Sequence, residues 1–249
     1  MPIRQFQAQR MHAPRDFQMI RPDPVCVEIG AGKGKHALLF SAQHPEKKLI
    51  AIERTREKYL AMQKQHVLEG QTNLQAIHAD AMPWIVHALL PAQVQQFFIL
   101  YPNPEPHNPA QRWLNMPFFE FLLSRLQVGG TITLASNIPE YIEEAQQQLI
   151  EVWKLPFVKE VIPGTSARTH FEIKYLQRGE LCQQLIISKP EGYSTRFDDF
   201  LPLQGQNPVQ AVAAATAVKD AEGVGYEKAC CDYWCGSCRL NGRGTVKPI

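Results

Sequence analysis

The chain of 249 residues is 45% hydrophobic and 20% charged, which is enough apolar sequence for a sizeable buried core and predicts a soluble globular protein. No stretch approaches the roughly 18 apolar residues of a membrane helix, and the first residues lack the apolar core of a secretory signal, so we expect no membrane partner and a cytoplasmic location. The net charge is only +2, so a nucleic-acid partner would have to be held by local basic patches.

From about residue 24, short β-branched or apolar runs alternate with amphipathic stretches. The expected strands are VCVEIG, KLIAIE, LQAIHA, FFILYP and TITLAS, and the expected helices cover residues 33–43, 55–69 and 117–127, with another starting near Ile138. This alternation predicts an open, mostly parallel α/β sheet whose site lies at the carboxyl ends of the strands. Further along, HFEIKYLQ and LCQQLIIS flank Arg178, Gly179 and Glu180, which predicts a terminal antiparallel hairpin.

The two ends of the chain differ from this middle section. Residues 1–22 contain one acid, Asp16, and four arginines, Arg4, Arg10, Arg15 and Arg21. They show no clear period, so we expect a basic N-terminal arm over residues 1–23, with a solvated disordered terminus as the alternative. The pattern changes again beyond residue 190. We therefore expect one domain over residues 24–202 and an appended tail over residues 203–249.

The run Glu28-Ile-Gly30-Ala-Gly32-Lys-Gly34 lies directly after an apolar strand and directly before a helix. Glycines at such a point let the backbone turn tightly and approach a ligand. The dinucleotide fingerprint has its third glycine one position later, where this chain has Lys35. The spacing fits instead the acid-x-Gly-x-Gly-x-Gly loop of S-adenosylmethionine (SAM) methyltransferases, and Glu28 would attract the cationic groups of SAM but repel a pyrophosphate. A chance glycine-rich turn is the alternative.

Two further carboxylates follow the next two strands. Glu53 ends the second strand, 19 residues after Gly34, where a carboxylate can accept hydrogen bonds from both ribose hydroxyls of an adenosine. Asp80 follows LQAIHA and is placed to accept from the adenine amino group. Each carboxylate alone could be a helix N-cap or a solvated surface group. Acids at the ends of three successive strands together predict a SAM site.

With these motifs, residues 24–190 resemble the bacterial tRNA (guanine-N7)-methyltransferases. The similar segments are VEIGAGKGKH, LIAIE, HADA, the loop after the fourth strand, RLQVGGTITLAS and SARTHFEIKYLQRGE. The resemblance implies a Rossmann-like class I methyltransferase fold, SAM as cofactor and tRNA as partner. It also implies that Thr169, Phe171 and Glu172 form the Thr-x-Phe/Tyr-Glu motif near the substrate, with Thr169 and Glu172 as substrate contacts. Without the resemblance, a strand with one outward-facing acid is an equally good interpretation of this segment.

The loop after the fourth strand departs from the family pattern, which is Pro-Asp-Pro-Trp-Pro followed by a run of Lys, Arg and His. This chain has Asn103 in place of the aspartate that positions the guanine and Glu105 in place of the tryptophan, and it keeps only His107 and Arg112 of the basic run. We expect Asn103 to be the catalytic residue and His107 and Arg112 to contact the substrate. Because a carboxylate is a stronger, two-oxygen acceptor than an amide, the change could cost about ten- to a hundredfold in guanine handling.

The altered loop leaves other interpretations open. Asn103-Pro-Glu105-Pro partly resembles the Asn-Pro-Pro-aromatic loop of methyltransferases that modify amino groups, in which the Asn oxygen helps to orient the NH2. A SAM- or RNA-binding paralogue without turnover is the third interpretation. RNA would be held by the basic arm and by cations around the strand ends, with about one unit of salt slope for each phosphate contact. These cations are Lys33, Lys35, Arg112, Arg168 and Lys174.

The six cysteines divide unevenly. Cys26 and Cys182 sit in apolar runs, and the others, Cys230, Cys231, Cys235 and Cys238, fall within nine residues. In a cytosolic chain such a cluster favours metal or redox chemistry over a disulfide framework. Four thiolates can close a structural zinc site, and the last two cysteines have the spacing of a zinc knuckle. The spacing also matches an iron-sulfur triad, and a chance cluster or a reversible disulfide is an equal alternative.

Overall fold

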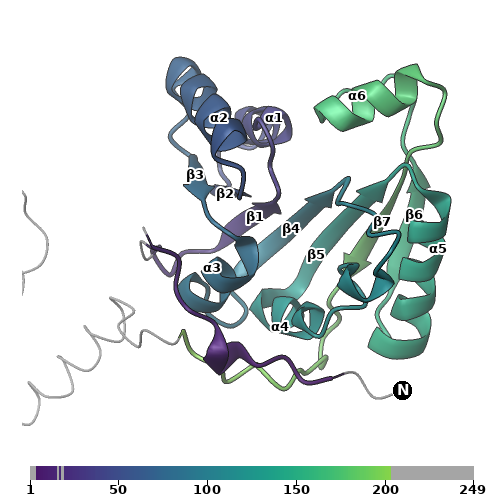
Figure 1. The fold of residues 1–249 in the computed structure, drawn as a ribbon. Helices are drawn as coiled ribbons and strands as arrows, with labels where there is room; N and C mark the ends of the chain where they lie inside the picture. The colour runs from purple at the N-terminus through teal and green to yellow at the C-terminus, as the bar shows by residue number, and fades with distance from the viewer. Residues whose placement is uncertain (1–3, 16, 18–19, 203–249) are drawn as a thin grey trace, which may run out of the picture. The chain divides into compact units, whose positions relative to one another are not determined.

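The computed structural model describes residues 4–15, 17 and 20–202, which all lie in the first of two units of the chain, Met1–Gly205. Within these residues seven strands form one sheet in the order β3-β2-β1-β4-β5-β7-β6 (Figure 1). The strands are β1 (Val25–Ile29), β2 (Leu49–Glu53), β3 (Leu74–His78), β4 (Val94–Leu100), β5 (Leu126–Ser136), β6 (Phe157–Val161) and β7 (Gln183–Ser188). The α-helices are α1 (Lys35–Gln43), α2 (Arg56–Glu69), α3 (Ala81–Ala88), α4 (Phe118–Arg125), α5 (Pro139–Gln148) and α6 (His170–Gln177). The expected tail lies outside the described residues, so the domain boundaries stay predictions.

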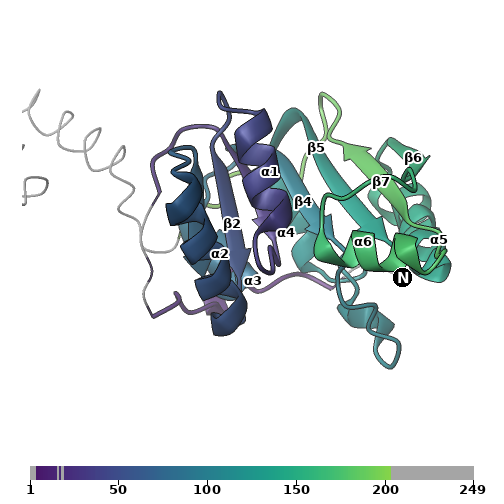
Figure 2. The same cartoon turned by 90° about the horizontal axis from the view of Figure 1, so that it is seen from above.

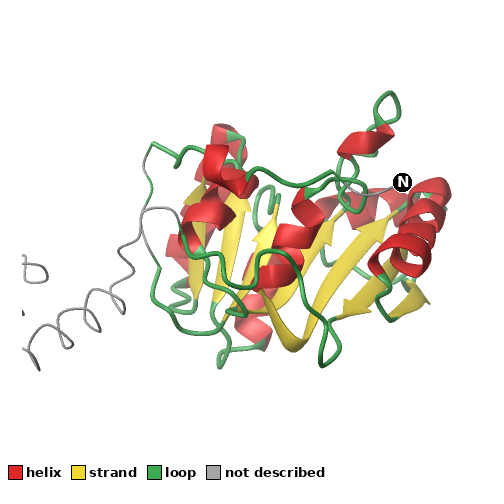
Figure 3. Ribbon diagram, turned by 90° about the horizontal axis from the view of Figure 1, so that it is seen from below, coloured by secondary structure: helices red, strands yellow, loops and turns green. Residues whose placement is uncertain are grey.

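The strands β3, β2, β1, β4 and β5 are parallel. Both β1 and β2 are buried along their whole length, which is why VCVEI and LIAIE are nearly continuous apolar runs. Val25, Val27 and Ile29 belong to the core cluster that contains residues of α3 and α4, whereas Cys26 belongs to the cluster that contains residues of α1. Helices therefore cover both faces of the sheet (Figure 3). The expected Rossmann-like, mostly parallel fold is confirmed.

Helix α3 is not predicted by the sequence pattern. Its sequence, AMPWIVHA, is apolar on nearly every side, and Trp84, Ile85 and Val86 are all buried. A helix buried on most sides lacks the amphipathic period on which prediction from sequence depends. The helix begins directly after Asp80, at the edge of the sheet where the parallel strands end.

The sheet ends in an antiparallel pair of strands, as expected, but the prediction was wrong for one of the two segments. LCQQLIIS does contain β7, which runs antiparallel to β5 and to β6. HFEIKYLQ is helix α6 rather than a strand, and its acid, Glu172, is buried rather than outward. The rings of Phe171 and Tyr175, four residues apart, stack with their centroids at 6.0 Å, which is a helical contact. The true partner strand, β6, is mostly exposed and so gives little pattern.

The described part of the N-terminal arm packs against the domain. Ala8 is fully buried. The Phe6 ring lies 5.1 Å from the Phe118 ring of α4, centroid to centroid, and the Met11 carbonyl lies 2.9 Å from the His87 Nε2 of α3. Arg10 stays exposed, so the arm combines an apolar attachment with a charged outer side.

A buried guanidinium ties the last described segment to the core. Arg125, at the end of α4, is fully buried. Its Nη1 donates to the carbonyls of Leu89 and Phe200 at 2.9 Å each, and its Nη2 donates to the carbonyl of Phe197 at 2.6 Å. Burial lowers the pKa of Arg125 to about 9. The backbone carbonyls of residues 197–200 thus satisfy a charge that lies inside the domain.

Candidate cofactor and substrate site

The glycine loop after β1 is open on one side and closely packed on the other. Gly30, Gly32 and Gly34 have φ angles of +75°, +61° and +81°, a region that disfavours other residues. A Cβ atom on Gly30 or Gly32 would meet nothing within 4 Å, whereas one on Gly34 would lie 2.4 Å from Cγ of Met62 in α2. The first two glycines therefore leave room for a ligand against the backbone. The third allows α1 and α2 to approach each other.

Glu53 anchors this loop to the end of β2. The residue is 6% exposed. Its Oε2 accepts from the Gly32 amide at 2.8 Å, and its Oε1 accepts from the Thr55 amide at 2.7 Å. Each carboxylate oxygen can accept a second hydrogen bond. Glu53 can therefore hold the loop in place and still accept from a pair of ligand hydroxyls.

Glu28 is buried and does not lie at the open side of the glycine loop. Its side chain in β1 is 3% exposed, and Oε2 lies 3.0 Å from Nδ1 of His36 in α1. The His36 ring in turn lies 4.8 Å from the Phe98 ring of β4, centroid to centroid. Sequence reasoning missed His36 because its partner lies eight residues away on another element. The structure therefore places the Glu28 carboxylate against α1.

Asp80 caps helix α3. Its Oδ1 accepts from the Met82 amide at 3.0 Å, and among the described residues no other donor is recorded for this carboxylate. Strands β2 and β3 pair with Glu53 beside His78, so Asp80 follows two residues beyond the partner of Glu53. The cap uses only Oδ1, so the contact with an adenine amino group stays a prediction for Oδ2.

The loop after β4 has an unusual backbone. Tyr101 and Glu105 have φ angles of +53° and +48°, a region that other structure must hold in place for a residue with a side chain and that recurs at functional sites. Asn103 is exposed, and its Nδ2 donates to Oε1 of Glu105 at 2.9 Å. That hydrogen bond leaves the Asn103 oxygen as an acceptor beside a carboxylate.

The two remaining basic residues of the loop differ in their surroundings. His107 is exposed. Arg112 donates from Nε to the carbonyl of Pro104 at 2.9 Å, forms an ion pair with Glu144 of α5, and stacks its guanidinium over the Tyr141 ring at 5.3 Å. In this structure Arg112 therefore links the loop to α5, and its expected contact with the substrate stays a prediction.

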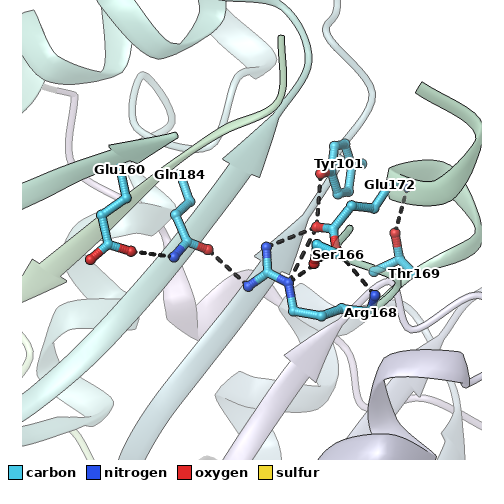
Figure 4. Close-up of polar contacts among 7 residues, drawn as sticks. All are labelled: Tyr101, Glu160, Ser166, Arg168, Thr169, Glu172 and Gln184. Atoms are coloured by element: carbon cyan, nitrogen blue, oxygen red, sulfur yellow. Dashed lines mark hydrogen bonds and ion pairs between the residues drawn. The ribbon is translucent and has the colours of Figure 1, made fainter. Parts of the chain in front are cut away.

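Glu172 joins the loop after β4 to the start of α6 (Figure 4). Its fully buried carboxylate accepts from the Tyr101 hydroxyl at 2.9 Å, from Nη2 of Arg168 at 2.8 Å and from the Ser166 hydroxyl. Thr169 caps the same helix, because its Oγ1 accepts from the Glu172 amide at 2.9 Å. The structure thus brings Thr169 and Glu172 together, and the recorded partners of the Glu172 carboxylate are side chains and a backbone amide of this chain.

The charge of Glu172 is stabilised by its partners. Burial alone would raise the pKa of Glu172, but the hydrogen bonds from Arg168 and Ser166 outweigh that effect and hold the pKa below its ordinary value. Burial, followed by hydrogen bonds with Cys182 and Glu172, raises the pKa of the Tyr101 phenol. The phenol therefore stays protonated and donates to the carboxylate.

Comparison with known proteins gives this site its context. Residues 22–184 match the model of a family described as putative methyltransferase. A tRNA (guanine-N7)-methyltransferase of Thiobacillus denitrificans is 30% identical over 182 residues, which cover 70% of this chain and 79% of that protein. The chain belongs to the tRNA (guanine-N7)-methyltransferase family. Proteins of the same name from Nitrosospira multiformis and Nitrosomonas eutropha are 29% and 28% identical and cover 69% and 68% of this chain, and 77% and 78% of their own lengths.

Solved structures agree with the fold of the methyltransferase. An antibiotic-related methyltransferase superposes with a TM-score of 0.51 at 11% identity, covering 67% of this chain and 87% of that one. The precorrin-6y C5,15-methyltransferase of Geobacter metallireducens superposes with a TM-score of 0.50 at 14% identity, covering 73% of this chain and 95% of that one. At such identities the likeness concerns the fold alone. Family membership makes the chain a SAM-dependent methyltransferase, as the glycine loop predicts.

Neither a metal centre nor a membrane helix occurs in the described part of the methyltransferase. No group of three or more His, Cys, Asp or Glu side chains there is arranged to hold a metal ion, and no helix there is long and apolar enough to span a bilayer. Cys26 and Cys182 are free and buried, and burial raises the pKa of Cys26 to about 11. The expected zinc ligands, Cys230, Cys231, Cys235 and Cys238, lie outside the described residues.

Proposed function

We propose that this methyltransferase transfers a methyl group from SAM to N7 of a guanine in tRNA. The family relationship supports the substrate, and one structural observation carries the cofactor assignment. That observation is the Glu53 carboxylate, which is held at the end of β2 by the amides of Gly32 and Thr55 beside two open glycines.

The residues at the edge of the sheet fit SAM. The backbone at Gly30 and Gly32 leaves room for the amino-acid portion, Glu53 would accept from the ribose hydroxyls, and Asp80 would accept from the adenine amino group. When bound, SAM supplies an electrophilic methyl group on its sulfonium. The chain's contribution is to fix the direction from which a nucleophile approaches.

Guanine N7 carries a lone pair and no proton, so its methylation requires placement rather than a general base. Asn103 and Glu105 are suited to such placement. The side-chain amide of Asn103 donates to the carboxylate of Glu105, which links the two acceptor groups of the loop, and N1–H and the N2 amino group of guanine are adjacent donors. We propose that this pair holds the guanine edge, with Glu105 supplying the charge that position 103 has lost.

The nature of the modified atom is the sharpest test. Purified protein is incubated with SAM and unmodified tRNA, the product nucleosides are identified by mass spectrometry, and RNA from a deletion strain is compared with RNA from its parent. We expect 7-methylguanosine in vitro and its loss at one position in the deletion strain. A methylated amino group would support the amino-group alternative, and SAM binding without any RNA product would support the paralogue without turnover.

For the tail we propose a structural zinc site formed by Cys230, Cys231, Cys235 and Cys238 and separable from methyl transfer. The support is their spacing in the sequence. Protein purified anaerobically without chelator should contain zinc. Protein with neither zinc nor iron, and with all four thiols freely titratable, would exclude the site.

A further inference from the structure

A hollow of about 800 Å³ lies beside the glycine loop. It is lined by Lys33 in the loop and Lys35 at the start of α1, by one side of α1 and of α2, and by Ala167, Arg168 and His170 before and at the start of α6. Figure 2 shows α6 across from α1 on this side of the molecule. None of the residues expected to hold SAM lines the hollow, so it is distinct from the cofactor site although it shares the loop.

Cations gather at the loop end of the hollow. Lys33, Lys35 and Arg168 line it, and its single acid is Glu69, the last residue of α2. Arg168 is bound to Glu172. In the described part of the chain no acceptor is recorded for the ammonium groups of Lys33 and Lys35. Their charges are therefore available to an anion.

Two lysines in this loop are unfavourable for the cofactor alone. SAM carries a sulfonium and an ammonium against one carboxylate, so nearby cations raise the electrostatic energy of the bound cofactor. An anion bound in the hollow would offset that repulsion. The wall of α1 and α2 also presents apolar surface at Leu39, Ala42 and Ala61, which suits a ribose or a base better than a free inorganic anion.

We propose that the hollow binds a sugar-phosphate segment of the RNA substrate, with Lys33 and Lys35 contacting phosphates and the α1–α2 wall contacting ribose or base. The inference rests on the proposed function and adds the place where the backbone of the RNA is held.

The test uses the full chain with Lys33→Gln, Lys35→Gln and both together, each of which removes charge while keeping a polar side chain. The matched control is Lys159→Gln, on the exposed strand β6 at the edge of the sheet. Affinity for a tRNA transcript is measured over a range of salt concentrations, and SAM affinity is measured by calorimetry. Each single variant should lower the salt slope by about 0.7 to 0.9, as expected for one lost phosphate contact, and the double variant should lower it by about twice as much. SAM affinity should be retained or raised, because the removed charges repel the cofactor. Lys159→Gln should leave the slope unchanged.

An unchanged salt slope in the double variant would overturn the inference. A loss of SAM affinity with an unchanged slope would do so as well, because it would place the lysines on the carboxylate of the cofactor. The proposed function fails separately, if wild-type protein forms no 7-methylguanosine. Wild-type protein that binds no RNA overturns both.

Discussion

Glu172 accepts more hydrogen bonds than any other carboxylate in the described residues. The donors are the Tyr101 and Ser166 hydroxyls and the backbone and guanidinium of Arg168. A buried charge is tolerated only when such partners replace water. Because Tyr101 immediately follows β4, this one carboxylate fixes the start of the substrate loop. It acts as a positioning residue in this conformation.

Replacing Glu172 by Gln should reveal this charge as a pH-dependent contribution to stability. The folded-state pKa is lowered, so the stabilisation is present above the unfolded-state pKa of about 4.3 and is lost as pH falls through the folded-state pKa. At neutral pH the variant should be less stable by about 1 to 3 kcal/mol. Urea unfolding at pH 7 and at lower pH values measures the difference in the free energy of unfolding between wild type and variant, which should become smaller in acid. A gap that is independent of pH would show that the carboxylate is not ionised in the folded protein.

Replacing Glu105 by Gln tests the acceptor pair of the substrate loop. Removing one charge-assisted hydrogen bond of about 1.5 to 3 kcal/mol should lower the rate of 7-methylguanosine formation by about ten- to a hundredfold. Asn103→Asp alone should gain little, because two carboxylates so close cannot both ionise freely. The double variant Asn103→Asp, Glu105→Gln should recover activity relative to Glu105→Gln. Wild-type rates in Glu105→Gln would contradict the pairing.

Replacing Glu53 by Ala should weaken binding of SAM and S-adenosylhomocysteine by roughly 1.5 to 3 kcal/mol, or about ten- to a hundredfold. Glu53→Gln keeps one acceptor and should fall between Ala and wild type. Glu57→Ala, an exposed acid in the first turn of α2, is the control. Unchanged calorimetric affinity in folded Glu53→Ala protein would refute the assignment.

At the scale of elements, the sequence predicts strands better than it predicts the segments around them. Strands β1 and β2 are recognisable because burial on both faces demands continuous apolar residues. Helix α6 was missed because Phe171, Ile173 and Tyr175 alternate with polar residues, a pattern that also fits a strand. What decides its structure is local: the Thr169 side chain satisfies the Glu172 amide at the helix start.

Replacing Thr169 by Ala should therefore loosen the first turn of α6. Loss of an N-cap costs about 1 kcal/mol, and Thr169→Ser, which keeps the hydroxyl, should retain most of it. Urea unfolding of the two variants measures the difference. Equal stabilities for Ala and Ser would mean that the hydroxyl does not cap the helix.

At the scale of the whole molecule, the order of the parallel strands makes part of the site predictable from the sequence, whereas the long-range contacts of the site are not. Glu28, Glu53 and Asp80 lie at or just beyond the carboxyl ends of β1, β2 and β3, so their shared edge follows from strand order alone. The contact between Tyr101 and Glu172 spans 71 residues. No local pattern marks such a pair, since it exists only once the sheet and α6 are both in place.

Shortening the chain from its C-terminus tests what completes the domain. A chain ending after Pro202 keeps both late carbonyl partners of Arg125 and should fold and bind SAM. A chain ending after Thr195 loses the carbonyls of Phe197 and Phe200 and leaves Arg125 with the Leu89 carbonyl and the Ser124 hydroxyl as acceptors. A buried cation that has lost part of its acceptors costs several kcal/mol. Circular dichroism melting distinguishes the two chains, and Arg125→Leu in the shorter one should restore part of the loss. A stable shorter chain with Arg125 intact would contradict this account.

The same guanidinium bears on the order in which the protein is made and folded. Two acceptors of Arg125 follow it by 72 and 75 residues. When only α4 and β5 have emerged from the ribosome, these two carbonyls are not yet present and the guanidinium lacks part of its hydrogen bonds. We expect the half-made domain to keep that helix near water. Its final core should form only when residues 197–200 emerge, which makes the end of the domain the last step of its cotranslational folding.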